Sequence, residues 1–233
     1  MLKSYICIDL ETTGLNPKRD KIIEIGAIKV IDGEMKDKFE SFVNPGRKLE
    51  ERIVELTGIK DEQLKDAPSI NEIWPALATF MEDLPLLGHS ILFDYSFLKK
   101  AAVDRKEEFE RTAVDTLRIA RRYLADLEHR NLEFLCNYYQ IPHKAHRAYE
   151  DALATHKLYE CLVRDFSQNE EGLFEPTSLI YKVKRDTPST PAQRERILKM
   201  IEQYHLEIDF DVDSLTRSEA SRFIDKTLAA CVK

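Results

Sequence analysis

The sequence predicts an α/β fold, a mixed five-stranded sheet flanked by helices, with a small helical module after it. Three β-branched segments joined by short turns lie within residues 5–43, and most later segments have helical spacing, which is typical of helices packed on a sheet. The composition then changes to a proline-containing, polar stretch followed by two more amphipathic patterns. We therefore divide the chain into a main domain over residues 1–168, a linker over 169–189 and a helical module over 190–233.

Composition and charge limit the possible functions. Of the 233 residues, 43% are hydrophobic and 33% are charged, as in globular proteins. The four cysteines are scattered and form no C-x-x-C pair, which fits a reducing, cytoplasmic location without a disulfide framework. No segment approaches the ~18 apolar residues of a membrane span, so no membrane association is expected. The net charge of −7 offers no basic face for nucleic acid, so metal ions would have to help hold any bound phosphate.

The strands are predicted from apolar runs bounded by turn residues. The first begins at Tyr5 and ends in a small-residue turn. Asp32-Gly33 is a hairpin signal between the second and third strands, and the third is polar enough for an edge. The other four predicted strands cover residues 21–31, 35–43, 85–88 and 112–116.

The helices are predicted from apolar stripes and capping residues. Ser69-Ile70-Asn71-Glu72 fits a capping box, so a helix begins there, although Pro75 predicts either a later start or a kink. Trp74 on its apolar stripe fits the core better than a base-stacking surface. The other predicted helices cover residues 50–56, 93–103, 116–124, 131–140 and 148–165.

Two acids follow the first strand directly. Because side chains alternate along a strand, Asp9 and Glu11 point to the same face and Leu10 to the other. Two carboxylates on one face of a core strand repel each other and are costly to desolvate, and a hard cation such as Mg²⁺ removes both costs. Taken alone, the D-x-E pattern also fits two solvated acids beyond a strand end.

Two further stretches add candidate site residues. Asp94 lies in the first turns of a predicted helix, where the helix dipole stabilises an acid even without a function. On one continuous helix His146 and Asp151 would be separated by about 500° of rotation and could not share a face. They can converge if His146 lies in the loop before the helix and Asp151 in its first turns. A single histidine beside a helix start is otherwise an ordinary surface residue.

Together these stretches resemble a known enzyme family. In order along the chain they are Asp9-x-Glu11-Thr12-Thr13-Gly14, Phe93-Asp94 and His146-x-Ala148-x-x-Asp151. This pattern is similar to that of the DEDDh (DnaQ-like) 3′→5′ exonucleases, which include the proofreading exonuclease of bacterial DNA polymerase III, and it covers about residues 4–166. The resemblance implies a ribonuclease H-like sheet. One departure is Ser90 after His89, where family members often have asparagine.

The resemblance also implies a metal-dependent mechanism with two divalent cations, Mg²⁺ or Mn²⁺. By this resemblance, Asp9, Glu11 and Asp151 hold the ion next to the attacking water. Asp9 also reaches the second ion, and Asp94 supports it. His146 would take the proton from the attacking water, so the rate should fall as the pH drops through the imidazole pKa, ordinarily about 6.5. The predicted substrate contacts are Thr12, Thr13, Gly14, Leu15, His89, Ser90 and Phe93.

The implied reaction releases nucleoside 5′-monophosphates from single-stranded or frayed 3′ ends of DNA, in DNA replication or repair. An RNA-directed 3′ exoribonuclease of the same family stays open, because no motif encodes a contact to a 2′-hydroxyl. A catalytically silent nucleic-acid-binding relative is the other alternative. Since all five family residues are present, the sequence favours the enzyme.

Two other clusters and one single acid imitate binding-site residues. His143, His146 and His156 suggest zinc, but no cysteine accompanies them and the nearby acids suit Mg²⁺ better. Asp209-x-Asp211-x-Asp213 starts like a calcium-binding EF-hand loop, but Ser214 stands where that loop needs glycine. Asp115 could be a further acid of the site, and a helix cap is the simpler interpretation.

The last segment has two capping boxes, Thr190-Pro191-Ala192-Gln193 and Thr216-Arg217-Ser218-Glu219. It is similar to small C-terminal modules of bacterial and phage DNA-metabolism proteins. Two helices of this size bury little alone, so they would pair together, dock on the main domain or bind a partner such as a polymerase. From Glu175 onward acidic and basic residues are equal in number, which favours a protein partner over a DNA clamp.

Overall fold

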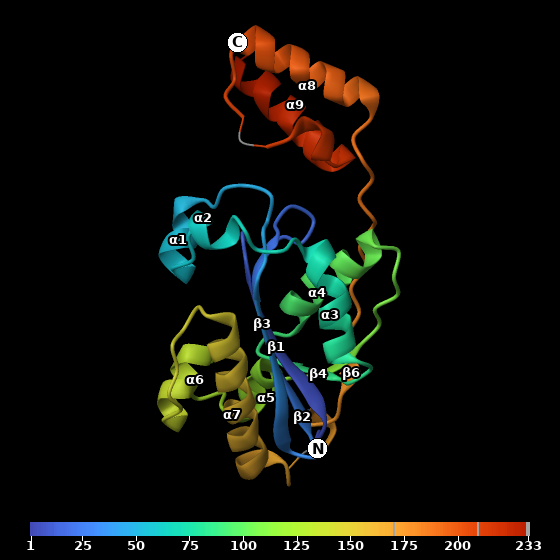
Figure 1. Cartoon of the computed structure of the whole chain (residues 1–233). Helices are drawn as coiled ribbons and strands as arrows, with labels where there is room; N and C mark the ends of the chain where they lie inside the picture. The colour runs from blue at the N-terminus through green and yellow to red at the C-terminus, as the bar shows by residue number, and fades with distance from the viewer. Residues whose placement is uncertain (170, 209, 232–233) are drawn as a thin grey trace. The chain divides into compact units, whose positions relative to one another are not determined.

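The computed structural model describes residues 1–169, 171–208 and 210–231 (Figure 1). These residues form two compact units, one of residues 1–45 and 49–183 and the other of residues 46–48 and 184–233. The domain boundaries predicted after residues 168 and 189 stay a prediction. Four residues of the predicted linker, calcium-loop pattern and helical module lie outside the described residues: Glu170, Asp209, Val232 and Lys233.

The first unit contains a mixed sheet of six strands in the order β3-β2-β1-β4-β5-β6. Its strands are β1 (Tyr5–Thr12), β2 (Ile22–Ile31), β3 (Glu34–Phe42), β4 (Leu86–Gly88), β5 (Thr112–Asp115) and β6 (Thr177–Ser178). The first three form an antiparallel meander, and β1, β4 and β5 run parallel to one another. The predicted mixed α/β sheet is therefore confirmed.

The predicted count of five strands is one short. β6 pairs antiparallel with β5 and lies within residues 169–189, which composition assigned to a linker. It has only two residues, both exposed, so no alternating pattern could mark it. Phe174 just before it is 1% exposed and packs in the core, so this part of the segment is a structural piece of the first unit.

Seven α-helices of the described chain surround the sheet. They are α1 (Glu51–Thr57), α2 (Asp61–Leu64), α3 (Ile70–Met81), α4 (Leu92–Asp104), α5 (Thr116–Tyr123), α6 (Leu132–Tyr139) and α7 (Ala148–Phe166), with a 3₁₀ turn η1 at Glu171–Leu173. All six predicted helices of this region are present, and their predicted ends lie within one residue of the observed ones. The one-turn helix α2 was not predicted, because four residues are too few for a period.

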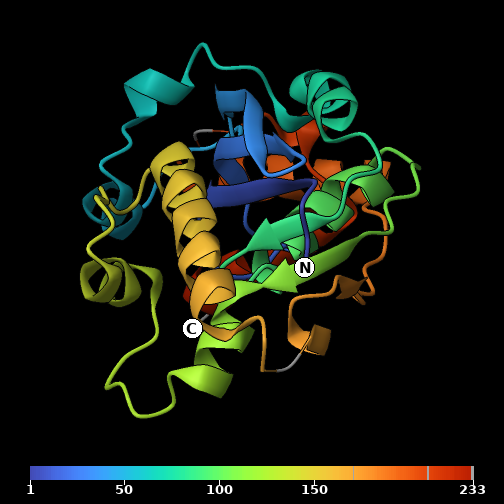
Figure 2. The ribbon, with the colours of Figure 1, turned by 90° about the horizontal axis from the view of Figure 1, so that it is seen from below.

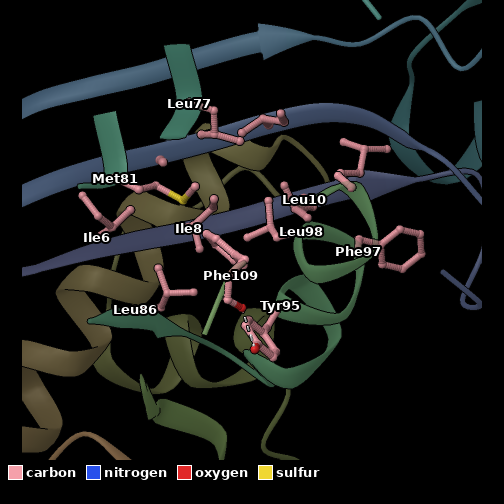
Figure 3. Packing of buried hydrophobic residues seen from close by; sticks show 14 of the residues in the cluster. Ile6, Ile8, Leu10, Leu77, Met81, Leu86, Tyr95, Phe97, Leu98 and Phe109 are labelled. Carbon is pink, nitrogen blue, oxygen red and sulfur yellow. Dashed lines mark hydrogen bonds between the residues drawn. The ribbon is translucent and has the colours of Figure 1, made fainter. Parts of the chain in front are cut away.

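The two faces of the sheet carry separate cores. Figures 1 and 2 show α7 along one face, with α3 and α4 on the other. Ile6, Ile8 and Leu10 of β1 point to the α3–α4 side, as Figure 3 shows. Tyr5 and Cys7 point to the α7 side. Because this alternation continues along the strand, it sets which acids of β1 face α7.

Pro75 lies inside α3, and the helix runs through it from Ile70 to Met81. A proline cannot donate the bond that the carbonyl of Asn71, four residues earlier, would accept. That carbonyl instead accepts a hydrogen bond from Arg105 Nη1 at 3.0 Å. Of the two outcomes predicted for Pro75, the later start is wrong, since the capping box of Ser69 and Glu72 is formed.

The second unit consists of α8 (Pro191–Tyr204), a 3₁₀ turn η2 (Val212–Ser214) and α9 (Arg217–Cys231). Both predicted capping boxes begin these helices, at Thr190 and at Thr216. Gln193 also donates to the carbonyl of Arg217 and to Ser221, and a β-bridge joins Pro188 to Thr216. The two helices thus pair with each other at their N-terminal ends. In the described chain no helix is long and apolar enough to cross a membrane.

Candidate active site

The site forms where β1 extends beyond its parallel neighbour. β1 pairs with β2 along its length, whereas β4 pairs only with Ile6 and Cys7. One edge of the last part of β1 is therefore open. Asp9 and Glu11 lie there, half-buried, on the face that Cys7 shares. The register with β2 shifts directly after Glu11, a β-bulge of the kind that ends pairing and redirects side chains at active sites.

At the open edge of β1, Asp94 from α4 provides the acceptor for a backbone N–H group. Its Oδ1 accepts a hydrogen bond from the backbone N–H of Leu10 at 3.1 Å, and only 3% of the residue is exposed. This bond anchors the acid to the strand segment between Asp9 and Glu11. Burial raises the pKa of Asp94 well above its ordinary value, although the hydrogen bonds that it accepts from backbone N–H groups oppose the rise.

Asp151 comes from the first turn of α7 and is 7% exposed. Its Oδ2 accepts a hydrogen bond from the N–H of Arg147 at 3.1 Å. The helix can come this close because β2 has a glycine, Gly26, opposite Asp9. A Cβ on Gly26 would lie 2.0 Å from the backbone nitrogen of Tyr149, in the first turn of α7. An isolated glycine in a strand pattern can signal such a close approach, but Gly26 was not among the predicted site residues.

Three carboxylates meet at this point. Oxygen atoms of Asp9, Glu11 and Asp151 all lie within 4.8 Å of one another, and no other such group of three or more His, Cys, Asp or Glu ligands occurs in the described residues. Asp94 is next to this group through its bond to Leu10, but is not a member of it. The described residues therefore contain no histidine cluster for zinc.

Burial and mutual repulsion make these acids hard to ionise. Burial, followed by the charges of Asp94 and Asp151, raises the pKa of Asp9 well above its ordinary value. The same causes, burial and then the charge of Asp151, raise the pKa of Glu11 to about 8. Hard oxygen donors whose charges are uncompensated within the protein fit a divalent cation such as Mg²⁺ or Mn²⁺. The carboxylates of Asp9, Glu11 and Asp151 are therefore suited to hold a divalent cation.

Two histidines of the loop before α7 lie near Asp151. His143 Nε2 hydrogen bonds with Asp151 Oδ1, and both side chains are nearly buried. Burial raises the pKa of Asp151, and the contact with His143 opposes that rise. His146, the predicted base, is exposed and has a left-handed backbone with φ of 65°. From the sequence, His143 was a candidate only for a zinc site, and no spacing pattern pairs it with Asp151.

The turn that is predicted to contact the substrate, residues 12–15, is fixed by hydrogen bonds within the protein. Thr12 Oγ1 donates to the carbonyl of Gly14 at 2.7 Å, and the N–H of Lys21 donates to Thr13 Oγ1 at 3.0 Å. A Cβ on Gly14 would collide with the carboxylate of Asp20, which explains the glycine. Leu15 follows with 84% of its surface exposed. The turn thus projects one apolar side chain from a braced backbone.

The other predicted substrate contacts differ in how far their side chains are already engaged by other residues of the protein. His89 is hydrogen bonded at both ring nitrogens, with Nε2 bonded to the carbonyl oxygen of Arg130 and Nδ1 to Thr116 Oγ1, each at 2.9 Å. Because a carbonyl only accepts, Nε2 carries the proton, and burial lowers the pKa of the ring. Phe93 is half-buried against Phe97. A substrate role for His89 and Phe93 stays a prediction.

Ser90 is exposed and tied to Asp115. Its N–H donates to Asp115 Oδ1 at 2.9 Å, and the same oxygen accepts from the N–H of Leu117 at the start of α5. Asp115 is the N-cap of α5, so the helix-cap interpretation is confirmed. Ser90 has φ of 70°, in the left-handed region that asparagine adopts more readily than serine. This gives a backbone reason for asparagine at this position.

Comparisons with known proteins place this arrangement in a family. The sequence model described as Exonuclease matches residues 6–159.

The chain belongs to the exonuclease family.

The recognition of the DEDDh exonuclease family from its motifs is thus confirmed. The exonuclease is also 34% identical over 197 residues to the PolC-type DNA polymerase III of Caldanaerobacter subterraneus, covering 83% of the chain and 14% of that polymerase. The corresponding polymerase of Bacillus cereus is 31% identical over 249 residues, covering 99% of the chain and 17% of its own length. The chain thus spans about one sixth of the length of these relatives.

Solved structures of similar fold include exonuclease X in complex with 5′-overhanging duplex DNA, with a TM-score of 0.59, 22% identity and coverage of 72% of this chain and 96% of that one. The nuclease domain of 3′hExo, a DEDDh family member bound to rAMP, gives a TM-score of 0.64 at 15% identity, with 77% and 98% covered. These likenesses confirm the predicted ribonuclease H-like fold of the exonuclease.

The raised pKa of Glu11 predicts a link between pH, metal and stability. A carboxyl group with a folded-state pKa of about 8 and an unfolded value of about 4.3 contributes stability below pH 4.3 that is lost as the pH rises through 8. Without divalent ions, this group should therefore lower the melting temperature of the exonuclease as the pH rises. A cation binds the ionised acids, so saturating Mn²⁺ should raise the melting temperature by roughly 5–10 °C at about pH 8.5 and by less than half of that at about pH 5.5.

Thermal unfolding followed by circular dichroism, in EDTA and in Mn²⁺, measures this difference. Glu11→Gln keeps the side-chain shape without the charge and should remove most of the Mn²⁺ effect. Equal Mn²⁺ effects at the two pH values in the unaltered protein would contradict the prediction.

Ser90→Asn should stabilise the exonuclease slightly. The left-handed backbone costs serine more than asparagine, so we expect about 0.5 kcal/mol and a rise of about 1–2 °C in melting temperature. Ser167→Asn serves as the matched control, because Ser167 has an ordinary helical φ of −62°. A gain at both positions, or at neither, would show that backbone conformation is not the cause.

Proposed function

We propose that this exonuclease removes nucleotides from the 3′ end of DNA and releases nucleoside 5′-monophosphates with the help of two divalent cations, Mg²⁺ or Mn²⁺. The observation that carries the proposal is the meeting of the carboxylates of Asp9, Glu11 and Asp151 within 4.8 Å, with Asp94 beside them. The supporting reason for DNA is the 30–38% identity of the chain to PolC-type DNA polymerases III.

Each residue has a proposed role. Asp9, Glu11 and Asp151 would hold one cation, and Asp9 with Asp94 would serve the second. When bound, the cations would neutralise charge on the phosphate and on the departing 3′-oxygen.

His146 would accept the proton of the attacking water, for which its exposed place beside Asp151 is suited. The turn that ends in Leu15 would bind the terminal nucleotide through its backbone N–H groups and its one exposed apolar side chain. His89, Ser90 and Phe93 keep their predicted place beside that nucleotide.

A degradation assay tests the proposal. The substrates are single-stranded DNA, duplex DNA with a matched or frayed 3′ end, and RNA of the same sequence, each carrying a 5′ label, with Mg²⁺, Mn²⁺ or EDTA. We expect a ladder that shortens from the 3′ end of DNA, mononucleotide 5′-phosphates as products, and no reaction in EDTA. Faster degradation of the RNA would replace the DNA assignment by an exoribonuclease. Binding of all substrates without degradation would indicate a silent relative.

We also propose that the α8–α9 unit docks on a DNA-metabolism protein such as a polymerase. The relatives named above are polymerases, charge in the C-terminal part is balanced, and Leu198 on α8 is 56% exposed. Analytical ultracentrifugation of the full chain with a replicative polymerase tests this. Leu198→Arg should weaken the complex, whereas Leu56→Arg in α1, at 52% exposure, should not. Equal binding by the two variants would contradict the docking role of α8.

A further inference from the structure

A buried acid outside the predicted set, Glu24 of β2, ties the start of α7 to the sheet. Arg147, the N-cap of α7, donates to Glu24 Oε1 from Nη2 at 2.8 Å and from Nε at 3.1 Å. The N–H of Ala148 donates to Glu24 Oε2 at 3.1 Å. The guanidinium also lies 5.6 Å from the ring centre of Phe42. Both oxygens of one carboxylate therefore hold two consecutive residues of the chain.

Glu24 is unsuited to bind a metal or the substrate itself. It lies opposite Glu11 across the β1–β2 pair, so it is close to the acid group, yet it is not a member of the group within 4.8 Å. Its oxygens already accept hydrogen bonds from N–H donors, and its side chain is 8% exposed. A carboxylate that is neutralised and covered in this way can act only through the residues that it holds.

The residue directly before Arg147 is His146. Its left-handed backbone, with φ of 65°, is a conformation that persists only where the neighbouring structure enforces it. On the other side, Asp151 is bonded to the N–H of Arg147. The pair of Glu24 and Arg147 thus fixes the residue between the proposed base and the proposed metal ligand.

We propose that Glu24 is a positioning residue that acts through Arg147 to hold the imidazole of His146 at the acid group. The inference rests on the proposed function for its effect on the reaction, but the placement of His146 can be measured without it. Asp151 is held in addition by the helix and by the close contact of α7 with Gly26, so losing Glu24 should free His146 more than Asp151. A pair that only stabilised the fold would have no such preference.

The test compares Glu24→Gln with Lys29→Met. Glutamine keeps the shape of Glu24 but loses the charge that holds the guanidinium. Lys29 lies on the same strand, roughly 17 Å further along it, and pairs with Glu82 at 2.8 Å, so its loss removes an ion pair far from the site. We expect Glu24→Gln to lower kcat by about 10–100-fold with KM and Mn²⁺ affinity changed less than about threefold. Lys29→Met should leave kcat within about twofold.

Two further measurements complete the test, and the first of them does not depend on activity. Ring resonances of the six histidines, observed by NMR in the metal-free protein and assigned with His146→Gln, should shift or broaden for His146 in Glu24→Gln, while those of His129 and His205 stay unchanged. The double variant with Arg147→Lys should lose no more activity than the more impaired single variant, because lysine cannot form the forked contact and both changes break one pair.

Two results would overturn the positioning role of Glu24. A Glu24→Gln protein with kcat within threefold of the unaltered enzyme and an unchanged His146 resonance would overturn the inference. Equal losses in Glu24→Gln and Lys29→Met would also overturn it, by showing a general effect on β2. If the unaltered protein degraded no nucleic acid, the proposed function would fail, and the NMR comparison alone would decide whether Glu24 positions His146.

Discussion

Asp151→Asn is expected to lower the turnover of 3′-end degradation about a thousandfold or more. Asparagine has the shape of the acid but no charge, so the group formed with Asp9 and Glu11 loses one of the three carboxylates proposed to hold a cation. Charge stabilisation by a bound metal contributes several kcal/mol to such a reaction, and about 4 kcal/mol corresponds to a factor of a thousand. Single-turnover degradation of a 5′-labelled single-stranded DNA at saturating Mg²⁺ measures the loss. Glu11→Ala should show a loss of the same order.

The fold should survive this substitution. Burial raises the pKa of Asp151, which means that the ionised carboxylate is unfavourable in the folded protein. Because asparagine is neutral, the melting temperature in EDTA should stay the same or rise. The matched control is Asp165→Asn on the same helix, where the side chain pairs with Arg164 roughly 20 Å along the axis from Asp151. Activity of Asp151→Asn within tenfold of the unaltered enzyme would refute the metal-ligand role.

Gly26→Ala should have the second-largest effect, from a single added methyl group. The new Cβ would lie 2.0 Å from the nitrogen of Tyr149 and 2.1 Å from the carbonyl carbon of Ala148, both backbone atoms. α7 must therefore move away from β2, at a cost of about 1–3 kcal/mol for overpacking. A displacement of about 1 Å at a reacting group can lower the rate about a hundredfold, and Asp151 moves with the helix.

Rate measurements and Mn²⁺ titrations on Gly26→Ala distinguish displacement from unfolding. We expect at least a hundredfold slower degradation and weaker Mn²⁺ binding in a protein that is still folded by circular dichroism. Gly172→Ala is the control, because nothing lies within 4 Å of a Cβ there. A Gly26→Ala protein with unchanged Mn²⁺ affinity and rate would show that the close approach of α7 is not required.

Much of the fold could be predicted because its signals are local. The strands from Tyr5 to Phe42 have apolar runs and a hairpin turn, and the helices have capping boxes or apolar stripes that read directly from neighbouring residues. β6 escaped because a two-residue exposed strand depends on β5, a distant partner, for its existence. The later helix start considered for Pro75 was wrong because the compensating donor, Arg105, is thirty residues away.

The site shows the same division. Asp9 and Glu11 could be assigned to one face from strand alternation alone. The approach of Asp94 and Asp151 to them needed the family pattern, because nothing local relates β1 to α4 or α7. The prediction missed three residues that act through contacts outside their own helix or strand: Gly26 opposite Asp9, Glu24 bonded to Arg147, and His143 bonded to Asp151. Each depends on a contact between segments more than about 100 residues apart or across an irregular loop.

The order of the acids along the chain has a consequence for biosynthesis. Asp9 and Glu11 leave the ribosome with the first strand and Asp94 with α4, but Asp151 belongs to α7, which is made after β1 to β5. A nascent chain that has not yet placed α7 over Gly26 has only two of the three carboxylates proposed to hold the first cation. With the proposed ligand set, the ability to cut nucleic acid should therefore arise late, when the nuclease region is nearly complete, and truncated products that stop before residue 148 should not degrade nucleic acid.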